Sequence, residues 1–197
     1  GRLKSVVYPK LLINGDEVIS PQFTYEYDLF DYQTAIVHPN GAKIQYLYNV
    51  QGKPTKVEHL DGKEELYEYS VSGSLSRHQE RDGNVKKYSY DNQGRITKIE
   101  HFHPGQISSY REDRYTYKGF HLASKKDSNG RETFEYDSMG RLSKSVIETE
   151  NSSSQRYCKN VTEFLYDHLG RVWGTKKWKN NTEFSLYRQE YDLLDRI

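Results

Sequence analysis

The sequence has few of the residues that build a thick hydrophobic core or a cross-linked fold. Its 197 residues include one cysteine, Cys158, so no disulfide can form within the chain. Hydrophobic residues make up 34% of the chain, whereas a typical globular domain is about half apolar. No apolar run approaches the roughly 20 residues that cross a bilayer. We therefore expect neither membrane insertion nor a single large dry core.

The sequence also lacks an excess of charge of one sign. It has 29 Lys and Arg against 28 Asp and Glu, and a formal net charge of +1. Nucleic-acid binders need a concentrated positive field, and disordered polyelectrolytes combine high net charge with few aromatic residues. Here 14% of the residues are aromatic and 18 are tyrosine, whose ring is apolar and whose hydroxyl is polar. We expect a folded chain that does not bind nucleic acid.

The tyrosines recur in a short motif, as in Tyr88-Ser-Tyr-Asp-Asn-Gln-Gly-Arg95. We call the second aromatic residue of each motif its marker tyrosine, and the first residue after the motif turn its arginine position. The first four marker tyrosines are 21 residues apart, and a longer gap contains the polar insertion 151–154, which we expect to be a loop. The marker tyrosines are Tyr27, Tyr48, Tyr69, Tyr90, Tyr117, Tyr136, Tyr166 and Tyr191. The other motif positions, which we expect to have structural roles, are Tyr25, Asp28, Tyr46, Gly52, Tyr67, Gly73, Tyr88, Asp91, Gly94, Arg95, Tyr115, Phe134, Asp137, Gly140, Arg141, Phe164, Asp167, Gly170, Arg171 and Asp192.

Each repeat contains two turn signals. Asp91 and Gly94 suit the first and fourth positions of a type I turn, because the carboxylate accepts a main-chain N–H and glycine adopts a positive φ. The segments between turns, such as 86–90 and 95–101, are rich in β-branched and aromatic residues, and no stretch has a sustained helical period. The second turn signals lie between motifs, at Asn40-Gly41, Asp61-Gly62, Asp82-Gly83, Pro104-Gly105 and Asn129-Gly130.

These signals predict an all-β fold, an antiparallel strip of consecutive β-hairpins with about 21 residues per repeat and almost no helix. Such a strip twists and cannot bury both faces as one layer, so we expect it to curve or spiral. The first residues, 1–3, match 140–142, and the last, 195–197, match 94–96. We expect residues 1–197 to be a single array of about eight repeats, cut in mid-repeat at both ends.

The string Tyr/Phe-x-Tyr-Asp-x-x-Gly-Arg-Leu/Ile/Val resembles the YD repeat of the Rhs family, which includes bacterial Rhs polymorphic toxins, wall-associated proteins, insecticidal toxin complexes and teneurins. The match is closest at 88–96, 134–142 and 164–172, and weaker at Ser70 and Lys118, which replace the aspartate. The resemblance implies a β-strip that spirals into a shell around a C-terminal toxic domain, in a secreted or cell-surface bacterial protein. The self-cleaving segment of such toxins has no counterpart here, since no Asp-Pro pair occurs.

Three histidines occupy one slot of the repeat. His38, His59 and His101 each follow a marker tyrosine by 11 residues, and Glu80 interrupts the series. Equivalent positions in neighbouring repeats lie about 10 Å apart, too far to share a metal ion. The pair His101 and His103 offers only two ligands. We expect no metal and no cofactor.

The remaining reactive residues form no catalytic pattern in the sequence. The carboxylates Glu64, Glu65 and Glu68 are interpreted as a solvated face, because nothing in a wet strip separates their pKa values. Cys158 has no histidine nearby in sequence, and neither a Gly-x-Ser-x-Gly elbow nor a glycine-rich phosphate loop is present. The sequence therefore indicates a protein that is not an enzyme.

Two functional hypotheses follow from the repeated aromatics. In the preferred one, tyrosines stack on each other across strands and the chain is part of a shell wall, with flanking repeats and an enclosed toxin domain as partners. In the alternative, the aromatic face binds carbohydrate at a cell surface. The aspartate and arginine of each motif are interpreted as turn formers joined by an ion pair that contributes little if exposed. Open edge strands predict self-association.

Overall fold

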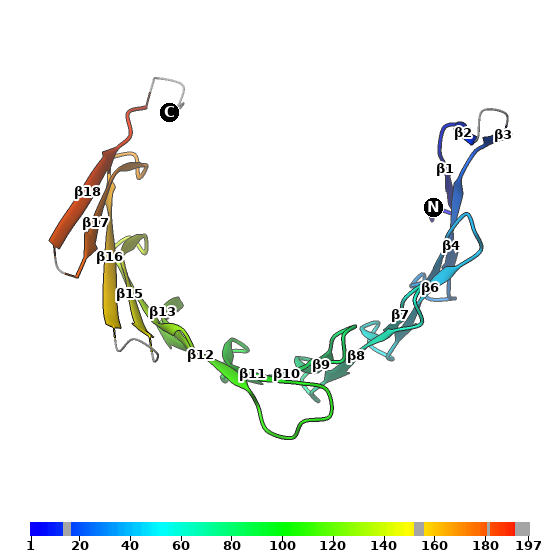
Figure 1. Ribbon diagram of the computed structural model, residues 1–197, viewed down its shortest axis with the longest axis horizontal. Helices are drawn as coiled ribbons and strands as arrows, with labels where there is room; N and C mark the ends of the chain where they lie inside the picture. Colours follow the sequence, from blue (N-terminus) through cyan, green and yellow to red (C-terminus); the bar gives the residue numbers. More distant parts are fainter. Residues whose placement is uncertain (14–16, 152–155, 181, 192–197) are drawn as a thin grey trace. The chain divides into compact units, whose positions relative to one another are not determined.

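The computed structural model describes residues 1–13, 17–151, 156–180 and 182–191, which are the described residues below. They form strands and turns without a helix, as predicted, and so contain no helix long and apolar enough to cross a membrane. Sixteen strands follow one another in a single sheet in chain order, β1 beside β4 and then β4 to β18, while β2 and β3 form a separate pair (Figure 1). The strands are β1 (Ser5–Val7), β2 (Leu11–Ile13), β3 (Glu17–Ile19), β4 (Gln22–Tyr27), β5 (Gln33–Val37), β6 (Lys43–Tyr48), β7 (Pro54–Glu58), β8 (Glu64–Tyr69), β9 (Leu75–Gln79), β10 (Val85–Tyr90), β11 (Ile96–Phe102), β12 (Arg111–Lys118), β13 (His121–Asp127), β14 (Gly130–Tyr136), β15 (Leu142–Asn151), β16 (Arg156–Tyr166), β17 (Val172–Lys179) and β18 (Thr182–Arg188).

The chain divides into two compact units. One comprises residues 1–88 and 101–109, and the other comprises 89–100 and 110–197. The strand pairs within each unit are antiparallel and join neighbours in sequence, such as β4 with β5 and β14 with β15. Because most pairs are joined by short turns, each unit is built from local contacts, which is the architecture that the repeat predicts.

The motif turns have the predicted geometry. At the turn 91–94, Asp91 Oδ1 accepts hydrogen bonds from the main-chain N–H groups of Gln93 (2.9 Å) and Arg95 (3.0 Å). Gly94 has a φ of 77°, a value that suits glycine because a side chain would be strained there. The turns at 137–140 and 167–170 repeat these hydrogen bonds. These hydrogen bonds and the positive φ of the glycine confirm the turns that the sequence predicts.

The turns between motifs begin two residues before the Asn-Gly and Asp-Gly pairs that signal them. In the turn 38–41, His38 N donates to Ala42 O (2.8 Å) and Gly41 N donates to His38 O (2.9 Å). The turns 59–62 and 80–83 are closed in the same way. Two of the histidines in the shared slot, His38 and His59, are thus the first residues of turns, and the Asn-Gly or Asp-Gly pair fills the third and fourth positions.

A β-bulge precedes the marker tyrosine in six hairpins. In the hairpin β4–β5, Glu26 pairs with Ala35 and Tyr27 pairs with Gln33, so Thr34 is the extra residue of the return strand. Three bulges carry a serine or threonine whose hydroxyl donates to the main-chain oxygen before the marker tyrosine; these hydroxyls belong to Thr55, Ser76 and Ser143. The shifts lie immediately before Tyr27, Tyr48, Tyr69, Tyr117, Tyr136 and Tyr166. Bulges re-aim side chains, and these bulges direct the marker tyrosine toward the preceding hairpin.

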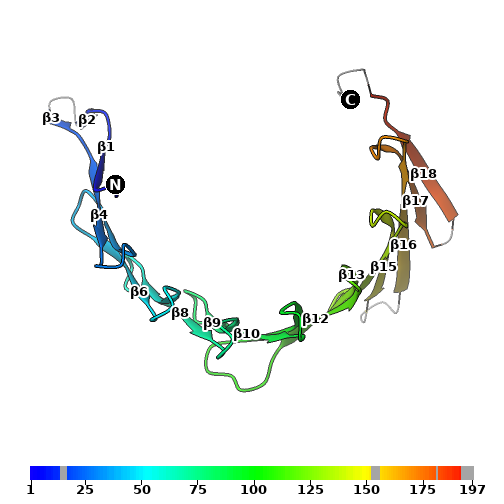
Figure 2. The same cartoon turned by 180° about the vertical axis from the view of Figure 1, so that it is seen from behind.

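The polar insertion after Glu150 was expected to be a loop, and part of that expectation is wrong. Strand β15 continues through Asn151, where it pairs with Arg156 at the start of β16. These two strands have 10 and 11 residues and are the longest in the sheet, and they lie side by side in both views (Figures 1 and 2). Residues 152–154 lie outside the described residues. Residues 142–151 contain no glycine or proline, and they include the β-branched Val146, Ile147 and Thr149, a composition that favours a longer strand.

The sheet buries little, as its composition predicts. Among the described residues the buried apolar side chains are Ala35 and Phe102, and the buried polar ones are Asp113 and Ser124. Ser124 exchanges a hydrogen bond with Thr116 on the paired strand (2.7 Å), and Asp113 pairs with Arg111 (2.8 Å). Stability must therefore come from half-buried side chains and from their polar contacts.

Candidate functional site

The residue at the arginine position lies over the marker tyrosine of the next hairpin. The guanidinium carbon of Arg95 is 4.2 Å from the centroid of the Tyr117 ring, and that of Arg141 is 4.3 Å from the Tyr166 centroid. The same contact joins Arg171 to Tyr191 (4.6 Å), Lys53 to Tyr69 (5.4 Å) and Arg2 to Tyr27 (5.6 Å). A cation at this distance is attracted by the negative face of the ring. We call this contact the arginine–tyrosine step.

The hydroxyl of the marker tyrosine completes the step. Tyr117 Oη donates to the main-chain oxygen of Ile96 (2.8 Å), which is the residue after Arg95. Tyr166 donates to Leu142 O in the same way (2.8 Å). Five more marker tyrosines make the equivalent bond, which links Tyr27 to Leu3, Tyr48 to Gln33, Tyr69 to Pro54, Tyr136 to Leu122 and Tyr191 to Val172. Ring and hydroxyl therefore both bind the preceding hairpin.

The motif aspartate holds the arginine in place for the step. Asp91 Oδ2 accepts from Arg95 Nε (2.8 Å) and lies 2.7 Å from a second guanidinium nitrogen. Both side chains are about one quarter exposed, at 23% and 27%. The main-chain N–H and the guanidinium of Arg95 lower the pKa of Asp91, and the same groups of Arg141 lower the pKa of Asp137. The pair was expected to contribute little if exposed, but it is only about one quarter exposed and it holds the cation over the ring.

Two steps use an aromatic ring in place of the cation. Tyr32 occupies an arginine position and stacks on Tyr48, with centroids 5.1 Å apart and planes 25° apart. His121 does the same to Tyr136, at 4.4 Å and 24°. The expected stacking between tyrosines is therefore found at the Tyr32 step, whereas five marker tyrosines meet a cation instead. The Tyr32 ring also lies on the next motif turn, where a Cβ on Gly52 would come within 2.2 Å of its hydroxyl.

The expected solvated face of carboxylates contains one organised cluster, around Glu65. Glu65 accepts from Tyr67 Oη (2.6 Å), and its oxygens lie 2.8 Å from His59 Nε2 and 3.3 Å from His78 Nε2. The Tyr67 hydrogen bond is the main cause that lowers the pKa of Glu65, while burial and then Glu65 raise the pKa of Tyr67. The Tyr67 ring stacks on His78 at 4.4 Å. The cluster joins β8 to β9 and to the turn at His59.

The neighbouring carboxylates are paired with single cations. Glu64 lies 2.5 Å from Lys56 Nζ, and Glu68 lies 2.8 Å from an Arg77 nitrogen. Across the described ranges no three side chains of the metal-binding types are placed to hold an ion. The other histidines and the cysteine are scattered, with His38 against Phe23 (4.9 Å), His103 Nδ1 3.4 Å from Asn84, and Cys158 Sγ 3.8 Å from Asn160.

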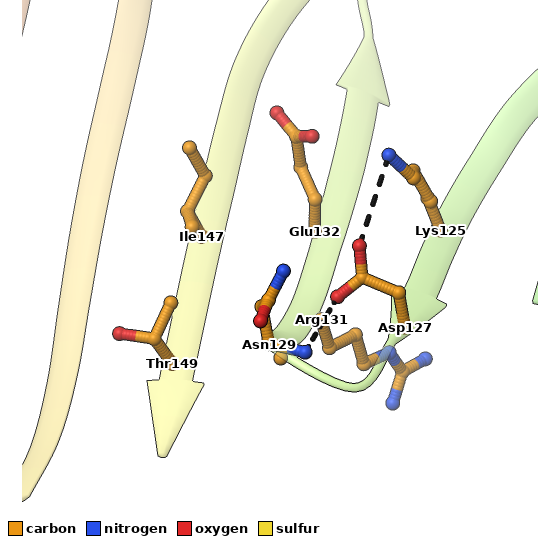
Figure 3. Close-up of a pocket in the computed structure, with 8 residues that line it drawn as sticks. Lys125, Asp127, Asn129, Arg131, Glu132, Ile147 and Thr149 are labelled. Carbon is orange, nitrogen blue, oxygen red and sulfur yellow. Dashed lines mark hydrogen bonds and ion pairs between the residues drawn. The ribbon is translucent and has the colours of Figure 1, made fainter. Parts of the chain in front are cut away.

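A small cavity of about 130 Å³ lies where the β13–β14 hairpin meets β15 (Figure 3). Figure 3 shows Asp127 between the side chain of Lys125, 3.9 Å away, and the main chain of Asn129, whose N–H it accepts at 2.8 Å. Asp127 Oδ2 also lies 3.5 Å from Arg111. Gly130 is required here, because a Cβ would lie 2.0 Å from the main-chain oxygen of Glu148. The cavity is a tight hairpin corner whose carboxylate is already paired.

The step, repeated along the sheet, is the most regular arrangement of polar side chains in the described residues. The family model of the teneurin YD-shell matches residues 2–193. The chain belongs to this family. As a YD-shell chain it is similar in fold to two crystal structures of TcdB2-TccC3, with TM-scores of 0.71 and 0.68 and identities of 16% and 15%. These matches cover 93% and 89% of this chain and 11% of each solved chain.

A structure of the Photorhabdus luminescens Tc holotoxin pore also matches the YD-shell chain, with a TM-score of 0.67, 16% identity, and coverage of 88% of this chain and 10% of that one. No curated protein matches it. The chain spans about a tenth of the length of the solved chains that it matches. At these identities the similarity shows the fold alone, and the fold is the hairpin strip that the sequence predicts.

The sequence analysis missed the step and the bulge that sets it. A signal for the bulge is present, since a small hydroxyl residue follows the arginine position by two residues at Thr34, Thr55, Ser76 and Ser143. A signal for the step is that Lys53, Tyr32 and His121 replace Arg at that position, since each can place a cation or an aromatic ring against a ring face, whereas Ser74 cannot. The last motif aspartate, Asp192, lies outside the described residues.

Proposed function

We propose that this chain is a non-catalytic wall segment of a larger secreted or cell-surface bacterial YD-shell protein, whose shell encloses a toxin or effector domain. One observation carries the proposal. The tyrosine, aspartate and arginine of the motif, which have its chemically most versatile side chains, are used to bind one hairpin to the next. Because these groups bind the neighbouring hairpin at each step, the repeat is specialised for continuity of the sheet.

The sheet order provides the way in which such a segment would join a longer wall. Strands β1 and β18 are the outermost strands of the sixteen-stranded sheet, so each has one side without a partner strand among the described residues. A flanking repeat would pair with that side and add one more arginine–tyrosine step. We infer that the preferred partners are flanking repeats of the same parent protein, and that the isolated chain self-associates through the same edges.

The carbohydrate hypothesis is less well supported by the geometry. Sugar rings stack on exposed aromatic faces, but five marker tyrosines carry a cation on one face, and two more carry the ring of Tyr32 or His121. The hydroxyls of the same tyrosines are bonded to main-chain oxygens. The residues that the hypothesis needs are thus largely committed within the sheet.

Protease protection in the full-length parent protein tests the wall role. We expect that Arg95→Gln combined with Arg141→Gln opens the wall and lets an added protease reach the enclosed domain, while the matched exposed variant Arg114→Gln leaves protection unchanged. Equal protection in the double variant and the wild type would contradict the wall role. Retention of the isolated chain on an immobilised glycan, lost on Tyr→Phe substitution without a loss of folding, would favour the carbohydrate hypothesis instead.

A further inference from the structure

A groove of about 420 Å³ opens between the motif turns 28–31 and 49–52. Its lining includes the carboxylate of Asp28, the rings of Phe30, Tyr32 and Tyr48, and the amide of Asn49. Phe30 is 79% exposed and Tyr32 is 37% exposed, and both residues line the groove. The groove therefore combines a carboxylate with open aromatic surface.

The groove contains an acid group that lacks the cation found elsewhere in the repeat. In the three turns that begin with Asp91, Asp137 and Asp167, the second carboxylate oxygen binds the arginine of the same motif, as Asp137 Oδ2 does with Arg141 Nε (2.7 Å). Tyr32 stands at that arginine position and cannot supply a cation. Asp28 Oδ1 still accepts from the N–H groups of Phe30 and Tyr32 (both 2.9 Å), whereas Asp28 Oδ2 has no hydrogen-bond or ion-pair partner within the described ranges.

The arginine near Asp28 binds groups other than the Asp28 carboxylate. Arg2 donates to the main-chain oxygen of Asp28 (3.1 Å), and its guanidinium pairs with Asp31 at 2.6 Å. The negative charge of Asp28 acts on a residue that lines the groove. The pKa of Tyr48 is raised by burial first, then by Tyr46 and by Asp28. A negative charge thus faces a half-enclosed space with aromatic walls.

We propose that this groove binds an arginine side chain of a partner polypeptide, with its guanidinium on Asp28 Oδ2 and against the rings of Phe30 and Tyr32. The chemistry is that of the repeat itself, in which an aspartate and an aromatic ring hold a guanidinium at Arg95, Arg141 and Arg171. Here the guanidinium comes from outside the chain. Carboxylates and aromatic faces together favour guanidinium groups over neutral side chains. The inference does not depend on what the wall encloses.

The chain contains a matched control for this site. A second groove of about 480 Å³ lies at the His121 step, where His121 stacks on Tyr136. Its lining includes Lys118, which replaces the motif aspartate, and two carboxylates, of which Asp137 is already bound by Arg141 and Glu135 is opposed by the positive charge of Lys118. The two grooves share an aromatic step but differ in the charge available, so a guanidinium should enter only the first.

The test is a titration of the isotope-labelled chain with the blocked peptide Gly-Arg-Gly, followed by two-dimensional NMR, with blocked Gly-Gln-Gly as the control ligand. We expect saturable shifts for residues 28–34 and 46–50 with the arginine peptide, and none at 118–123. Asp28→Asn should weaken binding about fivefold or more, the size of one ion pair of about 1 kcal/mol. It should leave the turn intact, because Asn49 holds the next turn with the same pair of N–H bonds, from Gln51 and Lys53.

A second variant supplies the missing group from within the chain. Tyr32→Arg restores the motif, so its own guanidinium should occupy Asp28 and abolish binding of the peptide, while the thermal midpoint stays equal or rises. Equal binding of the glutamine peptide, unchanged affinity in Asp28→Asn, or equal shifts at both grooves would each overturn the proposal. Loss of binding in Tyr32→Arg with the fold retained would support it.

Discussion

The guanidinium of Arg95 lies on the ring of Tyr117 in the next hairpin, and the Tyr117 hydroxyl donates back to Ile96, the residue after Arg95. The two contacts join the same two short segments from both sides. Arg95 is in turn fixed by Asp91 through two close contacts at 2.7 and 2.8 Å. An aspartate, an arginine and a tyrosine from two hairpins therefore act as one unit that sets the stagger between them.

Removing the cation should weaken this unit. Arg95→Gln loses the ion pair with Asp91, the contact with Tyr117 and a hydrogen bond to Gly119 O. We expect the free energy of unfolding to fall by about 1–3 kcal/mol, measured by urea denaturation. The control is Arg114→Gln, whose side chain is 66% exposed and pairs with Glu112, and which should change stability by about 0.5 kcal/mol or less. Equal losses in the two variants would contradict a special role for the step.

The glycine of a motif turn should be needed for close approach as well as for its φ. Gly52→Ala places a Cβ within 2.2 Å of the Tyr32 hydroxyl at a φ of 74°. Gly41→Ala is the matched control, since its φ is 81° and no atom lies within 4 Å of the new Cβ. Both variants should lose roughly 1–2 kcal/mol of stability, because alanine is strained in the left-handed conformation. Only Gly52→Ala should lose more stability than this. Thermal unfolding measures both, and adding Tyr32→Ala should remove the excess.

Acid should weaken the sheet through the motif aspartates. Their pKa values are lowered in the fold by hydrogen bonds from the arginine position, opposed by burial. A lowered carboxylate pKa contributes stability above its unfolded value near 4, and this contribution is lost as pH falls through the folded value. We expect the urea midpoint, followed by circular dichroism, to fall steeply below about pH 4.

The aspartate-to-asparagine variants test the cause of this acid sensitivity. Replacing Asp91, Asp137 and Asp167 by asparagine keeps the turns, as Asn49 shows, but removes the charge. The triple variant should be less stable than the wild type at pH 7 and should lose less on acidification. A fall as steep as that of the wild type would assign the acid sensitivity to other carboxylates, such as Glu65.

The Glu65 cluster gives a separate prediction at high pH. Burial and then the negative charge of Glu65 raise the pKa of the Tyr67 phenol above its usual value of 10. Glu65→Gln should lower that pKa toward 10, which ¹³Cζ NMR of the tyrosine ring detects residue by residue. Tyr69, whose pKa is raised by burial alone, should keep its value. An unchanged Tyr67 titration would mean that burial, without Glu65, sets its pKa.

The strands and motif turns were predictable because their chemistry is local. Asp91 and Gly94 lie within four residues of each other, so their identities fix a turn without reference to the rest of the chain. The repeat spacing then places one hairpin after another, and the balance of polar and aromatic residues excludes a thick core. The strip, its antiparallel order and the family followed from these features.

The arginine–tyrosine step could not be predicted because it depends on a register shift. The bulge before six of the marker tyrosines moves the ring by one position relative to the return strand, and alternation alone would place it differently. The partner of Arg95 is in another repeat, and no local rule selects Tyr117 over Tyr115. The groove at Asp28 could not be predicted for the same reason, because only the structure shows that Tyr32 takes the place of the arginine.

The step has a consequence for how such proteins change over evolution. Every step uses atoms of two successive hairpins, and its donors and acceptors recur in the same order at the next one. Unequal recombination that adds or deletes one complete repeat would therefore leave each remaining junction chemically matched, with an arginine position before every marker tyrosine. A break within a repeat would not. Selection can thus adjust the length of the sheet in whole repeats while individual junctions, such as the one at Tyr32, diverge.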